Sequence, residues 1–515
     1  MKAKFTKITV AVLSMATSTA FAANQVLTTD IVVIGTGSAG LSATVQAAEA
    51  GAKVITLEKN PFIGGGTSFA EGLFGVESEW NRLRSETLTR EEAFNGLMER
   101  HMHEPNAQQV RDFVWGCAEN LDWLAKHDIK FEVVRMTPWE EATWHVIGPY
   151  TNAQGKTTVH GAALVNALKD HADKLGVQTL TSTPAVGLIT NDKGDVIGVK
   201  AENTRTKDTY TINAKKVIIA TGGFADSAEK VKNWSHRDPN NWISCAPIGK
   251  TGDGIQMALD KGAAMGQVSY VGTYGTADKN NRVTIGDMLA ASWQPSSLWV
   301  NAKGDRFDNE EVAFSFSQSG NSIYRQQDSF GWTIFDDGQI KYMEDKGVDS
   351  GVGVIIPVGA KLKNLRKEIA DNIAKKADHV VSASSVEELA QKTGLPVENL
   401  KKSFDAYNKA CEMGFDGQFF KKARYLRPLD ATKLYAIKLR PLNFTSVGGL
   451  IVDRDFRVLD KNYKPIANLY AAGVDLSGYV GHTYTTWSSG YAFGFSSFSG
   501  RHAGLNAANA IKAGK

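Results

Sequence analysis

The stretch TDIVVIGTGSAGLSA, residues 29–43, decides the fold of this chain. Its apolar, β-branched run 31–34 is typical of a buried parallel strand, and an alanine-rich helix is expected over 41–50. Between the two lies a G-x-G-x-x-G motif formed by Gly35, Gly37 and Gly40. These glycines allow a tight turn and let a pyrophosphate approach the N-terminus of the helix, which attracts anions. The stretch therefore indicates a site for a dinucleotide.

A second strand, expected over 53–57, supports this interpretation because it ends at an acidic residue. Glu58 stands 18 residues after Gly40, at the place where a carboxylate accepts hydrogen bonds from a ribose. A lone G-x-G-x-x-G is a weak indication, but here strand, helix, second strand and acid follow in order. The sequence thus predicts an α/β, Rossmann-like domain that binds a dinucleotide.

Later glycine-rich segments favour FAD as the dinucleotide. The segments 64–72 (GGGTSFAEG), 216–223 and 466–478 return the chain to one site, which suits a long ligand. A hairpin that turns at Lys193-Gly194 precedes the second of them. No histidine occurs in 64–72, so non-covalent binding is expected. The predicted FAD contacts are Gly35, Gly37, Ser38, Ala39, Gly40, Glu58, Lys59, Gly65, Gly66, Thr67, Ser68, Gly72, Ala185, Ala220, Thr221, Gly222, Asp253, Gly473, Asp475, Gly490, Tyr491 and Phe493.

Composition excludes several other classes of protein. With 515 residues, the chain is expected to form two domains or more. A net charge of +3 without a dense basic run argues against nucleic acid as a partner. The three cysteines are scattered and form no CxxCH or CxxC motif, so neither a c-type haem nor an iron–sulfur cluster is expected. An HExxH motif is also missing, and no metal site is predicted.

Residues 1–22 have the three-part order of a secretory signal peptide. Three lysines come first, a short apolar run follows, and an A-x-A cleavage site ends at Ala22. The mature chain would begin near Ala23 and be periplasmic. No later segment is apolar over the length that a membrane span needs.

Three more motifs, together with these segments, carry a family resemblance. They are Thr251-Gly252-Asp253-Gly254, LWVNAKGDRFDNE at 298–310 and VGGLIVD at 447–453. As a set they resemble the fumarate reductase/succinate dehydrogenase flavoprotein family, and most closely its soluble periplasmic flavocytochrome c type branch, without the haem domain. The resemblance extends over nearly all of the chain after residue 28.

The resemblance implies a Rossmann-like FAD-binding domain with an inserted α+β capping domain. We expect the first part of the FAD-binding domain at 23–265, the capping domain at 266–435 and the rest of the FAD-binding domain at 436–515. In this family the substrate lies between the two domains and receives a hydride from the flavin at an activated C=C bond. An arginine supplies the proton, while histidines and a second arginine hold the substrate carboxylates.

This chain departs from the family pattern at these charged positions. Phe314 stands where the proton-donating arginine belongs, and Ala290 and Trp293 replace the glutamate and arginine that supply it with protons. Thr445 replaces a substrate histidine, Trp487 lies nearest the place of the second arginine, and the HPT histidine is missing. Because a buried dicarboxylate without cations is costly, fumarate reduction is not expected.

Aromatic side chains replace the missing charges, so an aromatic, bulky or weakly charged substrate is expected. A tyrosine hydroxyl group could protonate the substrate, and Tyr484 and Tyr274 are selected for this role. His482 is an alternative acid, although a structural role is favoured for it. Arg306, in the family's RF position, is expected to have a surface or packing role. The predicted pocket consists of Tyr270, Trp293, Phe314, Thr445, His482 and Trp487.

Three functions fit these observations. The first is an exported FAD-dependent reductase of an activated C=C bond in a substrate other than fumarate, with electrons from a separate cytochrome c or a membrane quinol system. The second is the reverse reaction, in a dehydrogenase resembling the 3-ketosteroid Δ1-dehydrogenases. The third is a flavin electron carrier without catalysis. The first is our prediction.

The remaining helix predictions concern 90–101, 107–126 and 161–175, the last with Thr157 or Thr158 as its cap. Two more helices are expected on either side of Gly394-Leu395-Pro396, the first of them capped by Ser385. A final helix is expected after Gly500.

Overall fold

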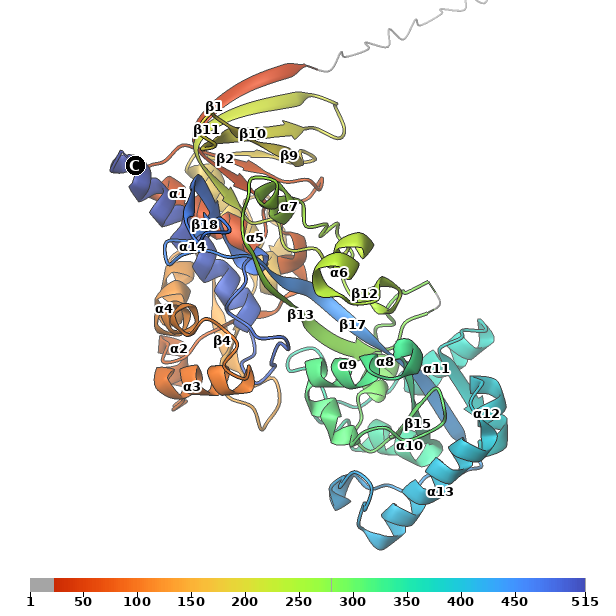
Figure 1. Ribbon diagram of the computed structural model, residues 1–515. Helices are drawn as coiled ribbons and strands as arrows, with labels where there is room; N and C mark the ends of the chain where they lie inside the picture. Colours follow the sequence, from red (N-terminus) through yellow and green to blue (C-terminus); the bar gives the residue numbers. More distant parts are fainter. Residues whose placement is uncertain (1–22, 279, 515) are drawn as a thin grey trace, which may run out of the picture.

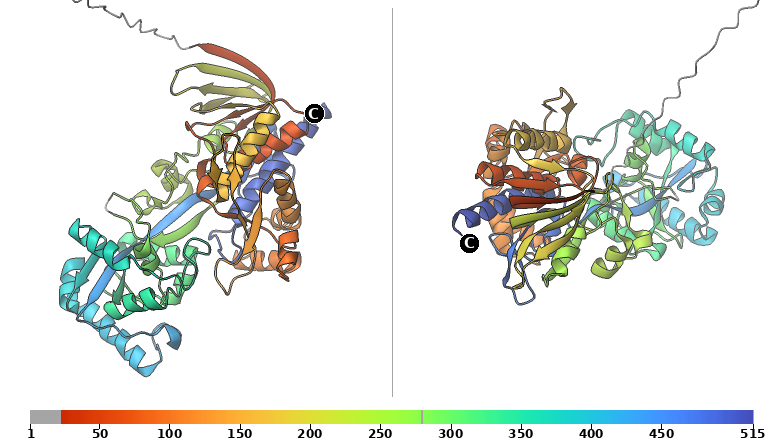
Figure 2. Two further views of the ribbon diagram at one scale, coloured as in Figure 1. Left: turned by 180° about the vertical axis from the view of Figure 1, so that it is seen from behind. Right: turned by 90° about the horizontal axis from the view of Figure 1, so that it is seen from above.

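The computed structural model describes residues 23–278 and 280–514. The predicted signal peptide, residues 1–22, lies outside the described residues. Two units are visible in Figure 1. The upper unit surrounds the large sheet that contains β1, β2 and β11, and the lower unit contains helices α8 to α13 and strand β15. The long strands β13 and β17 run between them. The views from behind and from above show the same arrangement (Figure 2).

An eight-stranded sheet forms the centre of the upper unit. Strands β19, β11, β1, β2 and β8 are parallel neighbours, and Ile31 pairs with Val54 on one side and Lys216 on the other. Residues 31–34 are at most 5% exposed, as expected for a strand covered on both faces. This arrangement confirms the predicted Rossmann-like α/β fold. The strands are β1 (Asn24–Ile34), β2 (Val54–Leu57), β8 (Gln178–Leu180), β9 (Ala185–Thr190), β10 (Val196–Glu202), β11 (Thr209–Ile219), β18 (Arg457–Leu459) and β19 (Pro465–Ala471).

Fourteen α-helices surround the sheets within the described residues. They are α1 (Ser38–Glu49), α2 (Glu79–Leu83), α3 (Arg90–Arg100), α4 (Ala107–Ala125), α5 (His160–Lys174), α6 (Ala228–Ser235), α7 (Asp253–Leu259), α8 (Asp287–Ser292), α9 (Phe316–Tyr324), α10 (Asp337–Asp345), α11 (Leu365–Ala374), α12 (Val386–Thr393), α13 (Val397–Met413) and α14 (Tyr491–Lys512).

Helices α1 and α14 pack closely because small residues face each other. A Cβ added at Gly500 would lie 2.1 Å from the carbonyl oxygen of Ala39, and one added at Gly504 would lie 2.3 Å from that of Ala43. Helix α14 begins at Tyr491, well before the predicted start after Gly500. Its glycine- and serine-rich first half has weak helix propensity, so this packing, and not the local sequence, stabilises it.

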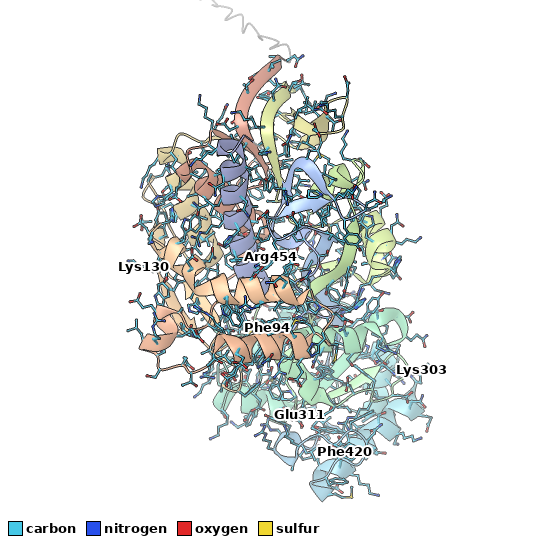
Figure 3. All side chains as sticks on the ribbon, turned by 60° about the vertical axis from the view of Figure 1, so that its left-hand side comes forward. Phe94, Lys130, Lys303, Glu311, Phe420 and Arg454 are labelled. Carbon is cyan, nitrogen blue, oxygen red and sulfur yellow. The ribbon has the colours of Figure 1, made fainter. Side chains whose placement is uncertain are left out.

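Helices α3 and α4 lie side by side, with Phe94 of α3 against Trp115 of α4 at a ring-centroid distance of 6.4 Å (Figure 3). Both helices, and α5, end within one residue of their predicted bounds.

The predicted cap of α5 is wrong. Thr157 and Thr158 form strand β7, which pairs with β6, and the residue before the helix is Val159, whose side chain cannot cap it.

A six-stranded sheet connects the two units through β13 and β17 (Figure 1). Residues 434–439 of β17 pair with β15, and residues 440–450 pair with β13. The predicted domain boundary at 436 therefore falls within one continuous strand, and the domain bounds stay a prediction. The strands are β12 (Ile243–Ser244), β13 (Met265–Gly275), β14 (Leu298–Asn301), β15 (Gly331–Asp336), β16 (Val380–Ala383) and β17 (Leu434–Leu450).

The lower unit has the predicted pair of helices α12 and α13. The Ser385 hydroxyl oxygen accepts a hydrogen bond from the Glu388 amide, so the expected cap is confirmed. Two small sheets complete the fold, and their strands are β3 (Gly72–Phe74), β4 (Phe131–Val134), β5 (Trp144–Ile147), β6 (Tyr150–Thr151) and β7 (Thr157–Thr158).

Candidate active site

A cavity of about 550 Å³ is lined by residues of both units. Its walls at one end are the turns that follow β1, β2 and β11, the segment 65–67 and the segment 249–253. Eighteen predicted FAD contacts line it: Gly35, Gly37, Ser38, Ala39, Glu58, Lys59, Gly65, Gly66, Thr67, Gly72, Ala185, Ala220, Thr221, Gly222, Asp253, Gly473, Gly490 and Phe493.

Glycine is required where the backbone turns toward this end of the cavity. Gly35 has φ +110°, and a Cβ there would lie 2.2 Å from the Ala220 carbonyl oxygen. Gly40 does not line the cavity. A Cβ on it would lie 2.0 Å from the Gly35 carbonyl oxygen, so its role is the close contact between helix and turn. Gly66 and Gly222 have open space in the Cβ direction, which leaves room for a ligand beside the backbone.

The acid at the end of β2 is held in place by the chain itself. Glu58 Oε2 accepts hydrogen bonds from the Thr36 amide and hydroxyl groups, and Oε1 accepts one from the Asn60 amide at 2.8 Å. The carboxylate is therefore oriented at the cavity wall before any ligand binds. Carboxylate oxygens have further lone pairs for the hydroxyl groups of a ribose.

Lys59 and the TGDG motif form a second polar group on this wall. Lys59 Nζ donates to Asp253 Oδ2 at 2.8 Å and to Thr251 Oγ1 at 2.7 Å. Asp253 also accepts from the Thr251 hydroxyl group. The charge of this lysine is thus compensated within the protein.

Three other predicted FAD contacts lie outside the cavity wall. Asp475 is fully buried and accepts hydrogen bonds from the amides of Thr221 and Gly223, so it holds the turn that lines the cavity. The Tyr491 hydroxyl group donates to the Tyr479 carbonyl oxygen at 3.0 Å inside the core. Ser68 lies on the opposite side of its segment, away from the cavity.

The rest of the cavity wall is mostly apolar. Of the predicted catalytic and pocket residues, Tyr274, Trp293, Thr445 and Tyr484 line the cavity. The sequence did not indicate most of its remaining walls, which include Met136, Trp144, Val283, Ile285, Leu289, Phe316, Val352, Ile355, Ile356, Leu442 and Phe444. Each is an ordinary apolar residue in its own segment, so no local pattern distinguishes it from the core.

Tyr484 and Tyr274 have different surroundings although both line the cavity. The Tyr484 hydroxyl oxygen accepts a hydrogen bond from the Ala492 amide at 3.1 Å, at the N-terminus of α14. Burial raises the pKa of Tyr484 to about 12, while the amides of this helix end act in the opposite direction. Its proton has no acceptor among the described residues. The Tyr274 hydroxyl group instead faces the Ala313 carbonyl oxygen at 3.5 Å, and its pKa is raised well above the usual value by complete burial.

The other four predicted pocket residues do not line the cavity. Tyr270 packs against Arg237, whose guanidinium carbon lies 4.0 Å from the tyrosine ring centroid. Phe314 packs against Trp139 with a distance of 4.6 Å between the ring centroids. His482 is exposed and pairs with Glu104 at 2.8 Å. Trp487 stacks against Arg100, whose guanidinium carbon lies 4.5 Å from the ring centroid.

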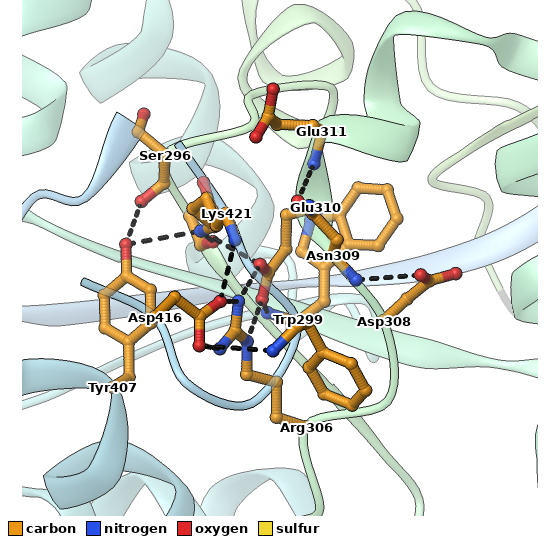
Figure 4. Close-up of polar contacts among 12 residues, drawn as sticks. Ser296, Trp299, Arg306, Asp308, Asn309, Glu310, Glu311, Tyr407, Asp416 and Lys421 are labelled. Atoms are coloured by element: carbon orange, nitrogen blue, oxygen red, sulfur yellow. Dashed lines mark hydrogen bonds and ion pairs between the residues drawn. The ribbon is translucent and has the colours of Figure 1, made fainter. Parts of the chain in front are cut away.

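Arg306 belongs to a buried charge network of the lower unit (Figure 4). Its Nη2 donates to Glu310 Oε2 at 2.7 Å and to Asp416 Oδ2 at 2.8 Å, and Lys421 Nζ lies 3.0 Å from Glu310 Oε2. Glu310 also accepts from the Trp299 amide. All four charged side chains are at most 2% exposed. Arg306 was expected to have a surface or a packing role, and its burial agrees with the packing role.

Two charged residues that line the cavity, Glu71 and Lys250, are not among the residues predicted from the sequence. Lys250 Nζ donates to the carbonyl oxygens of Ala246 and Phe444 and lies 3.8 Å from Asp226 Oδ1. No arginine or histidine lines the cavity within the described chain.

Among the residues that the structure describes, no cluster of His, Cys, Asp and Glu could hold a metal ion. No helix among them is both long and apolar enough to cross a membrane.

Comparison with known proteins defines the class of this site. The family described as an FAD binding domain matches residues 30–490. The chain belongs to this family of flavoproteins, which includes fumarate reductases, and it is an FAD-dependent oxidoreductase. The residues present fit FAD, because the glycine turn at the N-terminus of α1, an oriented acid and open space beside Gly66 and Gly222 lie along one cavity.

Two curated relatives show which enzymes the chain is similar to. It is 33% identical over 484 residues to the vinyl phenol reductase of Lactiplantibacillus plantarum, covering 93% of this chain and 96% of that protein. It is 28% identical over 456 residues to the urocanate reductase of Eggerthella lenta, covering 86% of this chain and 69% of that protein.

Solved structures have the same fold. An open flavocytochrome c3 fumarate reductase is 26% identical with a TM-score of 0.71, covering 94% of this chain and 78% of that one. The 3-ketosteroid Δ4-(5α)-dehydrogenase from Rhodococcus jostii is 24% identical with a TM-score of 0.70, covering 96% and 99%. At 24% identity the likeness concerns the fold alone.

Proposed function

We propose that this chain reduces the C=C bond of a neutral or weakly charged aromatic alkene such as a vinylphenol. The observation that carries this proposal is the single cavity that joins the FAD end to an aromatic and aliphatic end. The similarity to a vinyl phenol reductase supports the same substrate class. Both arguments agree with the sequence, in which uncharged residues stand where the fumarate reductase family has its catalytic and carboxylate-binding residues.

The charges of the cavity support a substrate other than fumarate. Two lysines line it, but Lys59 is paired with Asp253, and Lys250 is bonded to two carbonyl oxygens. A dicarboxylate would therefore enter an apolar space without a free cation, at a large desolvation cost. An aromatic ring would instead contact Trp293, Trp144 and Phe316.

Reduction of a C=C bond adds one hydride and one proton to adjacent carbons. FAD, when bound and reduced, supplies the hydride. The Tyr484 hydroxyl group is suited to supply the proton, because its oxygen is held by the Ala492 amide and its hydrogen is left for the substrate. The N-terminus of α14 stabilises the phenolate that remains. Water then reprotonates this oxygen before the next cycle.

The setting of the reaction is part of the proposal. A signal peptide at 1–22 would export the chain to the periplasm, where a cytochrome c or a membrane quinol dehydrogenase would supply the electrons. Cleavage near Ala22 is tested by N-terminal sequencing of the protein purified from the periplasmic fraction.

The proposed function is tested with purified chain under anaerobic conditions. Reduced methyl viologen supplies electrons, and 4-vinylphenol, 4-hydroxycinnamate and fumarate are the alkenes compared. We expect viologen oxidation with formation of 4-ethylphenol, and a value of kcat/KM for fumarate lower by about a hundredfold or more, because no cation holds its carboxylates. Rapid fumarate reduction contradicts the proposal. A dye-linked oxidation of a 3-ketosteroid, without reduction of any alkene, would instead support the reverse reaction.

A further inference from the structure

Glu71 is an acidic residue of the cavity that neither the cofactor motifs nor the proposed proton transfer uses. It lies directly before β3, on the segment that lines the cavity. The backbone around it is fixed, because the Ile147 amide donates to the Glu71 carbonyl oxygen at 3.0 Å and the Gly161 amide donates to the Ala70 carbonyl oxygen at 2.8 Å. Within the described chain, the only donor near its carboxyl group is its own backbone amide.

The segment that carries Glu71 contacts the segment that carries Tyr484. A Cβ added at Gly490 would lie 2.9 Å from the Gly72 carbonyl oxygen, and the Phe74 amide donates to the Gly490 carbonyl oxygen at 3.0 Å. Gly490 directly precedes α14, whose Ala492 amide binds Tyr484. Glu71 and Tyr484 therefore reach the cavity from two segments in contact.

Apolar side chains line the cavity that Glu71 reaches. Its neighbour Gly72 accepts a hydrogen bond from Trp144 Nε1 at 3.2 Å, and Trp144 and Met136 line the same cavity. Burial raises the pKa of Glu71 to about 7. The carboxyl group is thus charged in a large fraction of molecules at neutral pH, without a partner that compensates the charge.

Other ionisable groups do not remove this charge. His145 of β5, which packs on β3, has its pKa lowered to about 4 by burial and is neutral in this range. The ionisable residues that share the cavity are Glu58, Lys59, Cys245, Lys250, Asp253, Tyr274 and Tyr484. Both lysines are bonded elsewhere, and burial keeps the thiol and the two phenols protonated near neutral pH.

We propose that Glu71 determines substrate specificity: its carboxylate accepts a hydrogen bond from a hydroxyl group of a neutral alkene and repels alkenes that carry a carboxylate. This inference rests on the proposed function, since it names the substrate class of the same cavity. The Glu71 side chain is partly exposed to the cavity, and an acceptor without a partner at an apolar wall is stabilised by a donor. A carboxylate on the substrate would instead place a second negative charge in an apolar space.

The test compares two alkenes that differ by one carboxylate. 4-Vinylphenol and 4-hydroxycinnamate are reduced with methyl viologen by the wild-type chain and by Glu71→Gln, which keeps the shape but removes the charge. We expect wild type to prefer 4-vinylphenol, and the variant to lower the ratio of the two kcat/KM values by about tenfold or more. The wild-type preference should also fall as pH decreases from 8 to 6, because the carboxylate becomes protonated, while that of Glu71→Gln stays constant.

Two control variants separate charge from structure. Glu140→Gln removes a different carboxyl group, whose pKa burial raises to about 8, but Glu140 does not line the cavity, so the ratio should not change. Glu71→Asp keeps the charge and should keep the preference. FAD content, measured by absorbance, should equal that of wild type in all three variants.

The outcomes distinguish this inference from the proposed function. If wild type reduces neither alkene, the proposed function fails and the inference fails with it. If wild type reduces 4-vinylphenol and the ratio is unchanged in Glu71→Gln, the inference alone is overturned. A Glu71→Gln variant that loses FAD while its substrate ratio is unchanged would place the carboxyl group against the cofactor, which also overturns it.

Discussion

At the scale of single residues, identical side chains acquire different chemistry from their surroundings. Tyr484 and Tyr274 are both buried tyrosines that line the cavity. Tyr484 accepts an amide hydrogen at a helix N-terminus, whereas the Tyr274 hydroxyl group faces a carbonyl oxygen of the lower unit. An acceptor neighbour retains the proton, and a donor neighbour leaves it for the substrate. This contrast favours Tyr484 over Tyr274 as the proposed proton donor.

Replacement of Tyr484 by phenylalanine tests this assignment. We expect Tyr484→Phe to lower kcat for alkene reduction roughly 10²–10⁴-fold, the usual contribution of a positioned acid, with FAD binding unchanged. Tyr274→Phe is the matched control, because it removes the same atom from a fully buried ring of the same cavity. Steady-state rates with reduced viologen measure both. A larger loss in Tyr274→Phe than in Tyr484→Phe would reverse the assignment.

At the scale of elements, the α1–α14 contact positions the cofactor end of the cavity. Helix α1 begins at the glycine turn, and residues at the start of both α1 and α14 line the cavity, so their mutual distance affects its shape. Small residues at the contact bring the two helices close together. Packing of this kind tolerates little added volume.

A single methyl group at this contact should therefore be destabilising. Gly500→Ala places a Cβ 2.1 Å from a backbone oxygen of α1, and we expect a loss of about 1–3 kcal/mol in the free energy of unfolding, together with weaker FAD binding. Gly187→Ala in β9 is the control, since nothing lies within 4 Å of its added Cβ. Thermal unfolding and FAD titration measure the two effects. Equal stability of the two variants would contradict the packing argument.

At the scale of the whole molecule, the lower unit has its own stabilising network. Arg306, Glu310, Asp416 and Lys421 are buried together and compensate one another (Figure 4). Burial acts to raise the pKa of Asp416, but hydrogen bonds from Arg306 and backbone amides hold it at about 2. This carboxylate therefore stabilises the fold above pH 4, and the contribution is lost as pH falls toward 2.

Removal of one cation from this network should destabilise the lower unit strongly. We expect Arg306→Met to cost about 3–5 kcal/mol, because it leaves buried carboxylates without their partner. Arg366→Met is the control, because Arg366 also pairs with two carboxylates, those of Asp337 and Glu344, but its side chain is 42% exposed. We expect this variant to lose at most about 1 kcal/mol in the free energy of unfolding. Thermal unfolding at pH 7 and pH 3 measures both, and the difference between the variants should narrow at pH 3. A similar cost for both variants at pH 7 would contradict a buried network.

The cofactor end of the site could be predicted because its parts are close in sequence. The strand, the glycine turn, the helix and the acid at Glu58 follow one another, and each is determined by local chemistry. The four predicted FAD contacts outside the cavity wall, such as Asp475 and Tyr491, lie in segments whose other residues line the cavity. Their side-chain directions depend on neighbours far away in the chain.

The substrate end could not be predicted to the same degree, and β13 shows why. Alternation along a strand would place Tyr270 and Tyr274 on the same face. A register irregularity lies between the two tyrosines, because Val271 pairs with Thr445 and Gly272 with Asn443, which leaves Phe444 of β17 without a partner on β13. Tyr274 lines the cavity, whereas Tyr270 packs against Arg237. A bulge of this kind depends on the partner strand β17, which begins about 160 residues later.

The sequence by itself thus determined that this chain binds FAD in a Rossmann-like domain, and it predicted that the cations of a dicarboxylate site are missing. Both conclusions depend on which residue types stand at neighbouring positions. Only the tertiary structure decided which rings form the cavity wall, that Tyr484 meets a helix N-terminus and that Glu71 lines the cavity without a side-chain partner. These features arise where segments hundreds of residues apart come into contact, and such contacts are set by packing and not by local sequence.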